Sequence, residues 1–284
     1  MSVGIALALV AAIGYGTADF VGGAGARRAP SMSIVFIGQL TGAAAMLLVG
    51  LGSPGRATPT DFGWALLAGL GGAAGSIFLF RGLSRGRMGV VAPTSAVGAA
   101  ALPVLAGLAG GERPVAMVWT GLAIALPGIW LVSRQPATTY DATSGPRTEH
   151  AALVDGVLAG VGFGVLFVAL GRIPESAGTL PLAVNQLTGA VVTVVVATVL
   201  RQHWQPTARA AGWGTASGLL GVSGTLAFVH ASHLADLGVV AVLASLYPAV
   251  TVLLARGVLG ERIHAGQRLG LICCTAAVGM VAAG

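Results

Sequence analysis

Long apolar runs alternate with short polar breaks along almost the whole chain, and the breaks carry most of the arginines. A helix of roughly 20 mostly apolar residues is long enough to cross the hydrocarbon core of a bilayer. The runs cover residues 3–25, 31–51, 61–83, 89–109, 114–133, 151–171, 179–200, 210–234, 238–259 and 263–284. The pattern therefore predicts ten transmembrane helices.

One polar stretch is longer than the others and divides the chain. It runs from Arg134 to His150 and holds Pro136, Asp141 and Glu149. Polar residues and Pro clustered between regular segments are typical of a linker. We expect a first five-helix repeat over residues 1–134, a linker over 135–150 and a second five-helix repeat over 151–284.

The two halves share short sequences in the same order. Gln-Leu-Thr-Gly-Ala stands at 39–43 and again at 186–190. At an offset of 149 residues, Gly-Trp at 63–64 matches 212–213, and Gly-Glu-Arg at 111–113 matches 260–262. At an offset of 148, Gly-Tyr-Gly at 14–16 matches Gly-Phe-Gly at 162–164. Biased composition gives scattered Gly and Ala matches but not ordered motifs, so the sequence indicates a duplication.

The number of helices in each repeat sets the symmetry. With five spans, an odd number, the second copy enters the membrane from the opposite face. The predicted fold class is therefore an all-α integral membrane protein whose ten transmembrane helices form two inverted-topology repeats. In secondary transporters with this plan, the substrate binds near the midplane between the repeats, and alternating access exchanges their conformations.

Composition supports the membrane prediction and excludes several other functions. Of the 284 residues, 55% are hydrophobic and 8% are charged, whereas soluble domains carry about 25% charged residues. The net charge of +6 forms no basic patch with interleaved aromatics, so we expect no nucleic-acid partner. Cys273 and Cys274 are adjacent in one apolar run, which suits neither a disulfide framework nor a four-ligand metal site. We expect no metal and no cofactor.

The chain resembles the drug/metabolite transporter superfamily, in its ten-helix form with two EamA-type repeats. The resemblance covers nearly the whole chain and rests on the paired five-helix units, the two Gly-Glu-Arg motifs and Tyr247-Pro248. It implies a transporter of small metabolites, often an amino-acid exporter, that works by alternating access. It also implies that helices one to four and six to nine line a central cavity, with helices five and ten outside.

Polar and aromatic residues inside the runs are the candidates for substrate binding, because polar groups in hydrocarbon need a partner or a water-filled cavity. The carboxamides of Gln39, Asn185 and Gln186 both donate and accept hydrogen bonds, which suits a zwitterion, although they equally suit bonds between helices. Pro breaks place polar residues beside unwound backbone in the fourth and ninth spans. The predicted cavity residues are Tyr15, Asp19, Gln39, Phe78, Thr94, Ser95, Phe163, Asn185, Gln186, His230, Ser245 and Tyr247.

Two of these candidates carry titratable groups. Asp19 is suited to a substrate amine or a coupling proton, or to pairing with Arg27 or Arg28 near the helix end. His230 lies near the end of its run at the position equivalent to Arg81, where a polar residue is favoured in any case. The expected partners are therefore a small-molecule substrate and the lipid bilayer, and the sequence leaves proton coupling open.

We interpret the protein as a secondary transporter of small polar metabolites in the cell inner membrane, and its residue chemistry favours export of amino acids. Export of cationic drugs or other metabolites is the alternative, since Asp19 is the acid best placed to bind a cation. A remoter alternative is an intramembrane serine protease, because Gly221-Val222-Ser223-Gly224 resembles a rhomboid motif. Its Ser and His would share one helix, whereas a nucleophile needs its base within hydrogen-bond reach.

Charge also predicts the orientation. Twelve of the 15 arginines fall on one side of the predicted bundle, and Arg56, Arg113 and Arg172 fall with both termini on the other. Arg-rich loops stay in the cytoplasm, which places both termini outside it. The family resemblance more often implies termini inside.

Overall fold

The computed structural model describes residues 2–52, 55–84, 88–133, 146–260 and 263–283, and these contain helices but no strand. The elements are α1 (Ser2–Ala26), α2 (Ser31–Gly52), α3 (Pro59–Ser84), α4 (Met88–Ala109), α5 (Ala116–Ser133), α7 (Pro146–Gly171), η1 (Glu175–Ala177), α8 (Leu180–Val199), α9 (Ala208–Leu234), α10 (Leu237–Ala244), α11 (Tyr247–Leu259) and α12 (Ala265–Ala283). The all-α prediction is confirmed. Most of the predicted linker, and Glu261 and Arg262 of the second Gly-Glu-Arg motif, lie outside the described residues.

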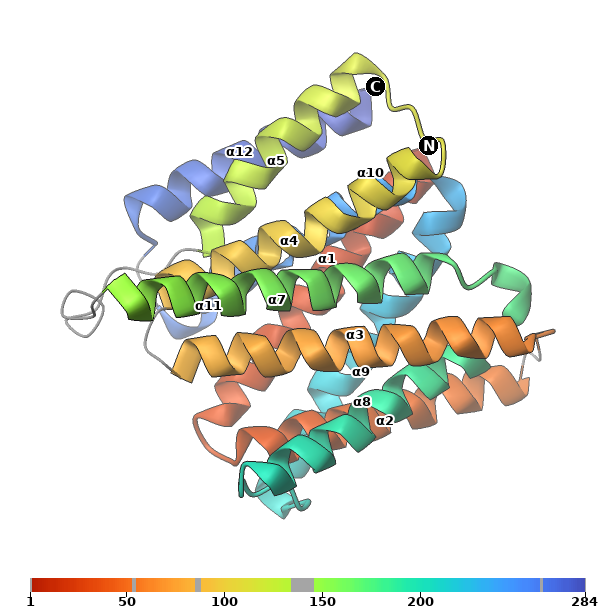
Figure 1. Ribbon diagram of the computed structural model, residues 1–284, viewed down its shortest axis with the longest axis vertical. Coiled ribbons are helices and arrows are strands. Elements are labelled where there is room, and N and C mark those ends of the chain that lie inside the picture. The colour runs from red at the N-terminus through yellow and green to blue at the C-terminus, as the bar shows by residue number, and fades with distance from the viewer. Residues whose placement is uncertain (1, 53–54, 85–87, 134–145, 261–262, 284) are drawn as a thin grey trace.

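Helices from the two halves interleave (Figure 1). α1 packs along α9 and its equivalent α7 packs along α3, while α2 pairs with α8 and α5 with α12. Contacts between helices of the same half are much less extensive. Exchanging the halves converts one set of pairings into the other, as expected for inverted repeats. Since neither half covers its own packing faces, the two halves form one bundle.

The loops that connect the helices lie at two opposite ends of this bundle. The turn at 27–30 and the loop at 200–207 lie at one end, which we call the turn side. Both ends of the described chain and the loops after α2 and α7 lie at the other end, which we call the terminal side (Figure 1).

Local sequence explains where several helices begin or break. Asp61 accepts hydrogen bonds from the backbone N–H and the hydroxyl of Thr58, a capping arrangement at the start of α3. The hydroxyl of Thr207 accepts from the N–H of Ala210 and caps α9. The predicted ninth span divides into α10 and α11 because Pro248 lacks an N–H for the carbonyl of Ala244.

The first Gly-Glu-Arg motif joins the two halves. Glu112 follows α4, and its carboxylate accepts hydrogen bonds from the N–H groups of Leu237 at 2.7 Å and Gly238 at 3.1 Å. These N–H groups begin α10 and have no acceptor within their own helix. A carboxylate at this position also complements the positive end of the helix dipole. The motif thus fixes the end of one repeat to a helix of the other.

Small residues let α4 and α7 approach closely. The four-residue spacing of Gly156, Gly160 and Gly164 predicts a tight helix contact, and each of them packs against α4. A methyl group added at Gly160 would lie 2.8 Å from the Cα of Gly98, and one at Gly156 would lie 2.8 Å from the Cβ of Thr94. The predicted close contact is confirmed, and it leaves no room for side chains at the crossing.

Nine spans among the described residues are long and apolar enough to cross a membrane, with α10 and α11 counted as one span over Leu237–Leu259. The remaining long helix, α9, is less apolar because it carries Ser217, Thr225 and His230. It packs against both α1 and α2, so protein rather than lipid covers much of its polar face. A helix covered in this way needs less apolar surface than one surrounded by lipid.

Replacing Gly160 with Leu tests the α4–α7 crossing. We expect the variant to lose about 1–3 kcal/mol of unfolding free energy, because the added side chain forces the two backbones apart. The matched control is Gly279→Leu on α12, where an added Cβ meets nothing within 4 Å. The control should change stability by less than about 0.5 kcal/mol. Unfolding in detergent measures both, and equal losses would contradict the close-contact interpretation.

Candidate functional site

A cavity of about 820 Å³ lies between the two halves. Its walls come from α1, α2 and α3 of the first half and from α7, α8 and α9 of the second. Ligand sites in proteins commonly enclose about 300–1,000 Å³. Its polar lining residues include Tyr15, Asp19, Gln39, Ser76, Arg81, Asn185, Gln186, Thr193, Gln202, Ser217 and Thr225. A membrane protein retains such a set of polar groups only where protein or water surrounds them.

The repeated pentapeptide meets its own copy in the cavity wall. The carboxamide of Gln39 on α2 lies against Gly189 on α8, and the carboxamide of Gln186 lies against Gly42. A methyl group added at Gly189 would come within 2.9 Å of the Gln39 Nε2 atom. Gly in each copy therefore makes room for Gln of the other, and both glutamines line the cavity.

Several hydrogen-bond acceptors on this lining have no donor among the described residues. The Oε1 atom of Gln39 and the Oδ1 atom of Asn185 are buried and have no hydrogen-bond partner among the described residues. The Nδ2 group of Asn185 donates to Gln186 at 3.4 Å. The carboxylate of Asp19 is exposed to the cavity and forms no hydrogen bond or ion pair with the described part of the chain. Buried acceptors without donors are costly, so the cavity is suited to a molecule that brings N–H groups.

The positive charge in the lining is matched by a buried acid. Arg81 on α3 lies 2.9 Å through Nε from the Oδ1 atom of Asp155 on α7, and its guanidinium also stacks on Phe78. Asp155 begins the sixth apolar run, where the sequence suggests a charge at a helix start, and the structure corrects this position. α7 begins at Pro146, so Asp155 lies two turns inside it and is fully buried. A buried carboxylate needs a charged partner, and Arg81 supplies it.

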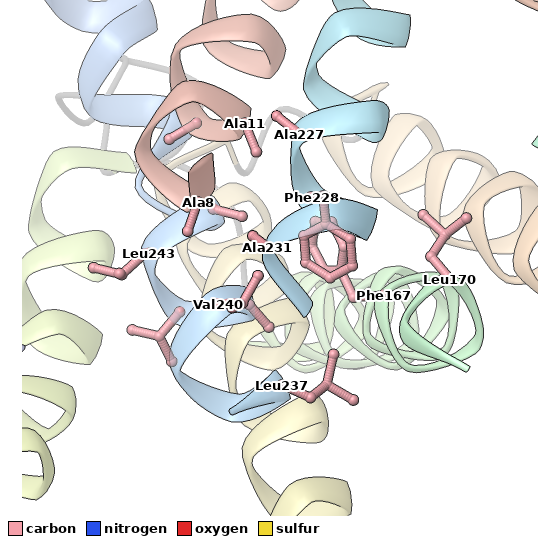
Figure 2. Close-up of a cluster of buried hydrophobic side chains, with 14 of the residues drawn as sticks. Ala8, Ala11, Phe167, Leu170, Ala227, Phe228, Ala231, Leu237, Val240 and Leu243 are labelled. Atoms are coloured by element: carbon pink, nitrogen blue, oxygen red, sulfur yellow. The ribbon is translucent and has the colours of Figure 1, made fainter. Parts of the chain in front are cut away.

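The terminal side of the cavity is sealed. The hydroxyl of Tyr15 donates to Thr225 at 3.2 Å. Behind it, the ring of Phe167 lies 4.8 Å from that of Phe228 and 6.1 Å from that of Tyr15. Figure 2 shows this layer continuing through Leu170 of α7, Ala231 of α9 and Leu243 of α10. The side chains fill the end of the bundle, so no open route leads to the terminal side through this layer.

The turn side is open. The cavity lining reaches Met32 in the first turn of α2, Arg81 near the end of α3, and Gln202 in the loop after α8. Arg81 and Gln202 are exposed. Because these residues lie at the turn side, the cavity opens there, and the structure is that of a bundle closed at one end and open at the other.

Six of the twelve predicted residues line this cavity: Tyr15, Asp19, Gln39, Phe163, Asn185 and Gln186. They come from α1, α2, α7 and α8, where the repeat matches bring equivalent positions to opposite walls. The implied contribution of the fourth and ninth helices is not found, since no described residue of α4, α10 or α11 lines the cavity.

The other six predicted residues lie outside the cavity lining. Thr94 packs on Gly156, and Ser95 is buried with its hydroxyl bonded to Ala92, because α4 is tightly packed along α7. Ser245 is fully buried at the α10–α11 break. The remaining three face other surroundings: Phe78 lies under Arg81, Tyr247 packs its backbone on Gly16, and His230 is exposed near the terminal side.

Several lining residues were not predicted, including Ser76, Ser217 and Thr225. Ser76 and Thr225 are equivalent at the offset of 149 residues, as are Arg81 and His230. Comparing polar positions in the third and eighth spans at that offset is the signal that selects them. The protease alternative gains no support, because Ser223 bonds to Leu220 at 2.7 Å and His230 lies 2.9 Å from the carbonyl of Leu226, within their own helix.

Interleaved inverted repeats around a polar cavity open at one end are typical of secondary transporters. The sequence matches the EamA-like transporter family over residues 2–134 and again over 151–283, so the chain belongs to this family. It is thus a multi-pass membrane protein of the drug/metabolite transporter type, with a small-molecule substrate, and its family is not one of enzymes. No curated protein matches the sequence. A solved crystal structure of a protein shares the fold over 98% of this chain and 96% of its own, with a TM-score of 0.76 and 15% identity.

Replacing Tyr15 with Phe tests the seal at the terminal side. Losing the bond to Thr225 should favour opening of that side by about 0.6 kcal/mol, or about threefold in the open population. The readout is maleimide labelling of a Leu182→Cys reporter, placed near the terminal side where Leu182 is buried. Thr225→Val should have the same effect without adding to it, while Thr120→Val, on an exposed face of α5, should have none. Additive effects would show that the hydroxyl pair does not hold the seal.

Proposed function

We propose that this protein exports amino acids or closely similar small metabolites by alternating access. The observation that carries the proposal is a group of acceptors on lining residues of the cavity: the carboxylate of Asp19 and the amide oxygens of Gln39 and Asn185, which have no donor among the described residues. An ammonium group brings three N–H donors and a positive charge to such a set. Arg81, at the mouth of the same cavity, supplies donors for a carboxylate. The lining of one cavity therefore offers groups of both kinds to a zwitterion.

The symmetry of the bundle supports the transport cycle. Each pairing of helices across the halves has an equivalent, so the closed and open ends are built from matching helices. Exchanging the conformations of the halves would close the turn side and open the terminal side. His230 would then occupy at the terminal mouth the place that Arg81 has at the present one, since the two are equivalent in the repeats.

We place the protein in the cell inner membrane with the turn side in the cytoplasm. Eight arginines of the described residues lie at that side, against three at the other: Arg27, Arg28, Arg81, Arg147, Arg201, Arg209, Arg256 and Arg268 against Arg56, Arg113 and Arg172. Cytoplasmic loops carry the excess of arginine. In this orientation the open cavity faces the cytoplasm, where an exporter loads its substrate.

Export of cationic amines is the second candidate. Asp19 gives the cavity an uncompensated negative charge, and Tyr15 and Phe163 add aromatic rings to the same lining. Carboxylate and aromatic groups together favour organic cations. The two candidates differ in whether the substrate needs its own carboxylate, so esterified amino acids distinguish them.

A counterflow assay in proteoliposomes tests the proposed function. Liposomes preloaded with an unlabelled amino acid should accumulate the labelled one, and a methyl ester should compete poorly if Arg81 binds the carboxylate. Gly221→Phe should reduce uptake at least about tenfold, because the ring fills a space where an added Cβ meets only Ala18, at 3.9 Å. Gly63→Phe, where nothing lies within 4 Å, is the control. Failure of every amino acid to accelerate exchange would reject amino-acid transport.

A fluorescent protein fused to the C-terminus tests the orientation. Green fluorescent protein folds only on the cytoplasmic side, whereas alkaline phosphatase is active only outside it. We expect a dark fluorescent fusion and an active phosphatase fusion, because the arginine distribution places the terminal side outside the cytoplasm. The opposite pair of results would reverse the direction in which the present cavity faces.

A further inference from the structure

The sealed terminal side shows which residues would seal the turn side. At the terminal side α7 contacts α9, whereas the equivalent pair at the turn side, α1 and α3, has at most a marginal contact. The present structure thus shows one end in the closed arrangement and the other in the open arrangement. The repeat offsets identify which residue of one half would take the surroundings of which residue of the other half when the closed end opens and the open end closes.

The hydrogen-bonded pair of the seal has equivalents of similar shape, whereas the ring at the centre of the apolar layer has a charged equivalent. Tyr15, which seals with Thr225, is equivalent to Phe163, and Thr225 is equivalent to Ser76. Gly75 already packs on the Phe163 ring as Gly224 packs on Tyr15. Phe167, at the centre of the apolar layer, is equivalent to Asp19 at the offset of 148 that also relates Tyr15 to Phe163. The centre of one seal is a phenyl ring, and the centre of the other is a carboxylate.

Asp19 and Phe167 now have opposite surroundings. Phe167 is 5% exposed and packs between Tyr15 and Phe228. Asp19 is exposed to the open cavity. In the equivalent closed arrangement it would pack between Phe163 and Leu79, the counterparts of Tyr15 and Phe228. Neither offers a hydrogen bond, and burial of an unpaired carboxylate in such a place is strongly unfavourable.

The charged and titratable groups near Asp19 do not remove this obstacle. Tyr247 of α11 interacts electrostatically with Asp19 and brings no positive charge. Tyr15 on its own helix is bonded to Thr225, and α2, α9 and α10 offer no acid or base to the cavity. Arg81 is the cation in the lining, and Asp155 matches its charge. Arg28, beyond the end of α1, stacks on Trp213. Because Arg81 is the one cation on the described lining, we expect the neutralising charge to arrive with a ligand.

We propose that Asp19 makes closure of the turn side depend on a bound positive charge. The charge comes from the ammonium group of the cargo or from a proton. With the carboxylate neutralised, the turn side closes over Asp19 as the terminal side now closes over Phe167. With the carboxylate free, the empty cavity stays open to the turn side. This inference rests on the proposed alternating access and adds the chemical condition under which it proceeds.

Two matched cysteine reporters measure closure without a transport assay. Val35 lines the cavity near the turn side. At the offset of 147 that relates Gln39 to Gln186, it is equivalent to Leu182, which is buried near the terminal side. Each is replaced by Cys in full-length protein with Cys273→Ala and Cys274→Ala, in liposomes, and labelled with an uncharged maleimide. Labelling of Ser31→Cys, exposed at the start of α2, corrects for the effect of pH on thiol reactivity.

The expected results separate Asp19 from its neutral variant. In alkaline buffer without amines, the Val35→Cys reporter should be labelled rapidly in protein that keeps Asp19. In the Asp19→Asn variant, whose turn side closes freely, labelling should be about tenfold slower. Leu182→Cys should change in the opposite sense. Asp19→Glu should behave as the unsubstituted protein, which separates the effect of charge from that of altered packing.

Two further arms identify the source of the charge. Butylammonium chloride should slow labelling of the Val35→Cys reporter in protein that keeps Asp19, but not in the Asp19→Asn variant. Sodium butyrate at equal ionic strength should have no effect on either. If butylammonium is inactive and acidic buffer alone produces the slowing, the charge is a proton.

The proposal is overturned if Val35→Cys labels equally with Asp19 and Asp19→Asn in every buffer. Should Leu182→Cys then still respond to amino acids, alternating access stands and only the role of Asp19 fails. If neither reporter changes under any condition, the proposed function fails together with it.

Discussion

The structure depends on the close approach of helices that belong to different halves of the chain. Glycine permits this approach at Gly98 and Gly160, and at Gly14 and Gly224, where backbone meets backbone. In a bilayer, lipid tails are as apolar as the side chains, so helices associate through close packing and hydrogen bonds rather than through the hydrophobic effect. The halves therefore have to interlock. That interlocking makes a central cavity between them possible, because each wall combines helices of both repeats.

The bilayer also constrains the polar groups of the bundle, because a polar group in hydrocarbon needs a partner. Those of Glu112 and Thr58 satisfy helix ends, and Asp155 is paired with Arg81. Gln39, Asn185 and Asp19 instead keep acceptors that the described chain does not satisfy, and all three line one cavity. The polar groups at the helix ends and the Arg81–Asp155 pair thus have partners, whereas these three acceptors in the cavity lining do not. This difference is the physical basis of the proposed specificity for amines.

Inverted symmetry alone would make a transporter indifferent to which side is open. The chain departs from symmetry at many equivalent positions, and at one of them a phenyl ring, Phe167, corresponds to a carboxylate, Asp19. A phenyl ring can be buried in a closed seal without a polar partner, whereas an ionised carboxylate cannot. A duplicated scaffold therefore supplies the two conformations, and a single unmatched residue can set the condition for exchange between them.

Much of the fold and half of the candidate site could be predicted from the sequence. Run lengths and ordered matches determined the helices and their inverted duplication, since spanning length and chain direction follow from local sequence. The same matches selected Gln39 and Gln186, each of which packs against the glycine of the other copy in the cavity wall. They could not show that Thr94, Ser95 and Ser245 are packed away, nor that Asp155 lies inside a longer helix.

Which polar residue faces a neighbouring helix and which faces the cavity depends on how helices distant in sequence pack and on which end of the bundle is closed. Only the tertiary structure decides both, because local periodicity describes one helix at a time and symmetry leaves the two ends equivalent.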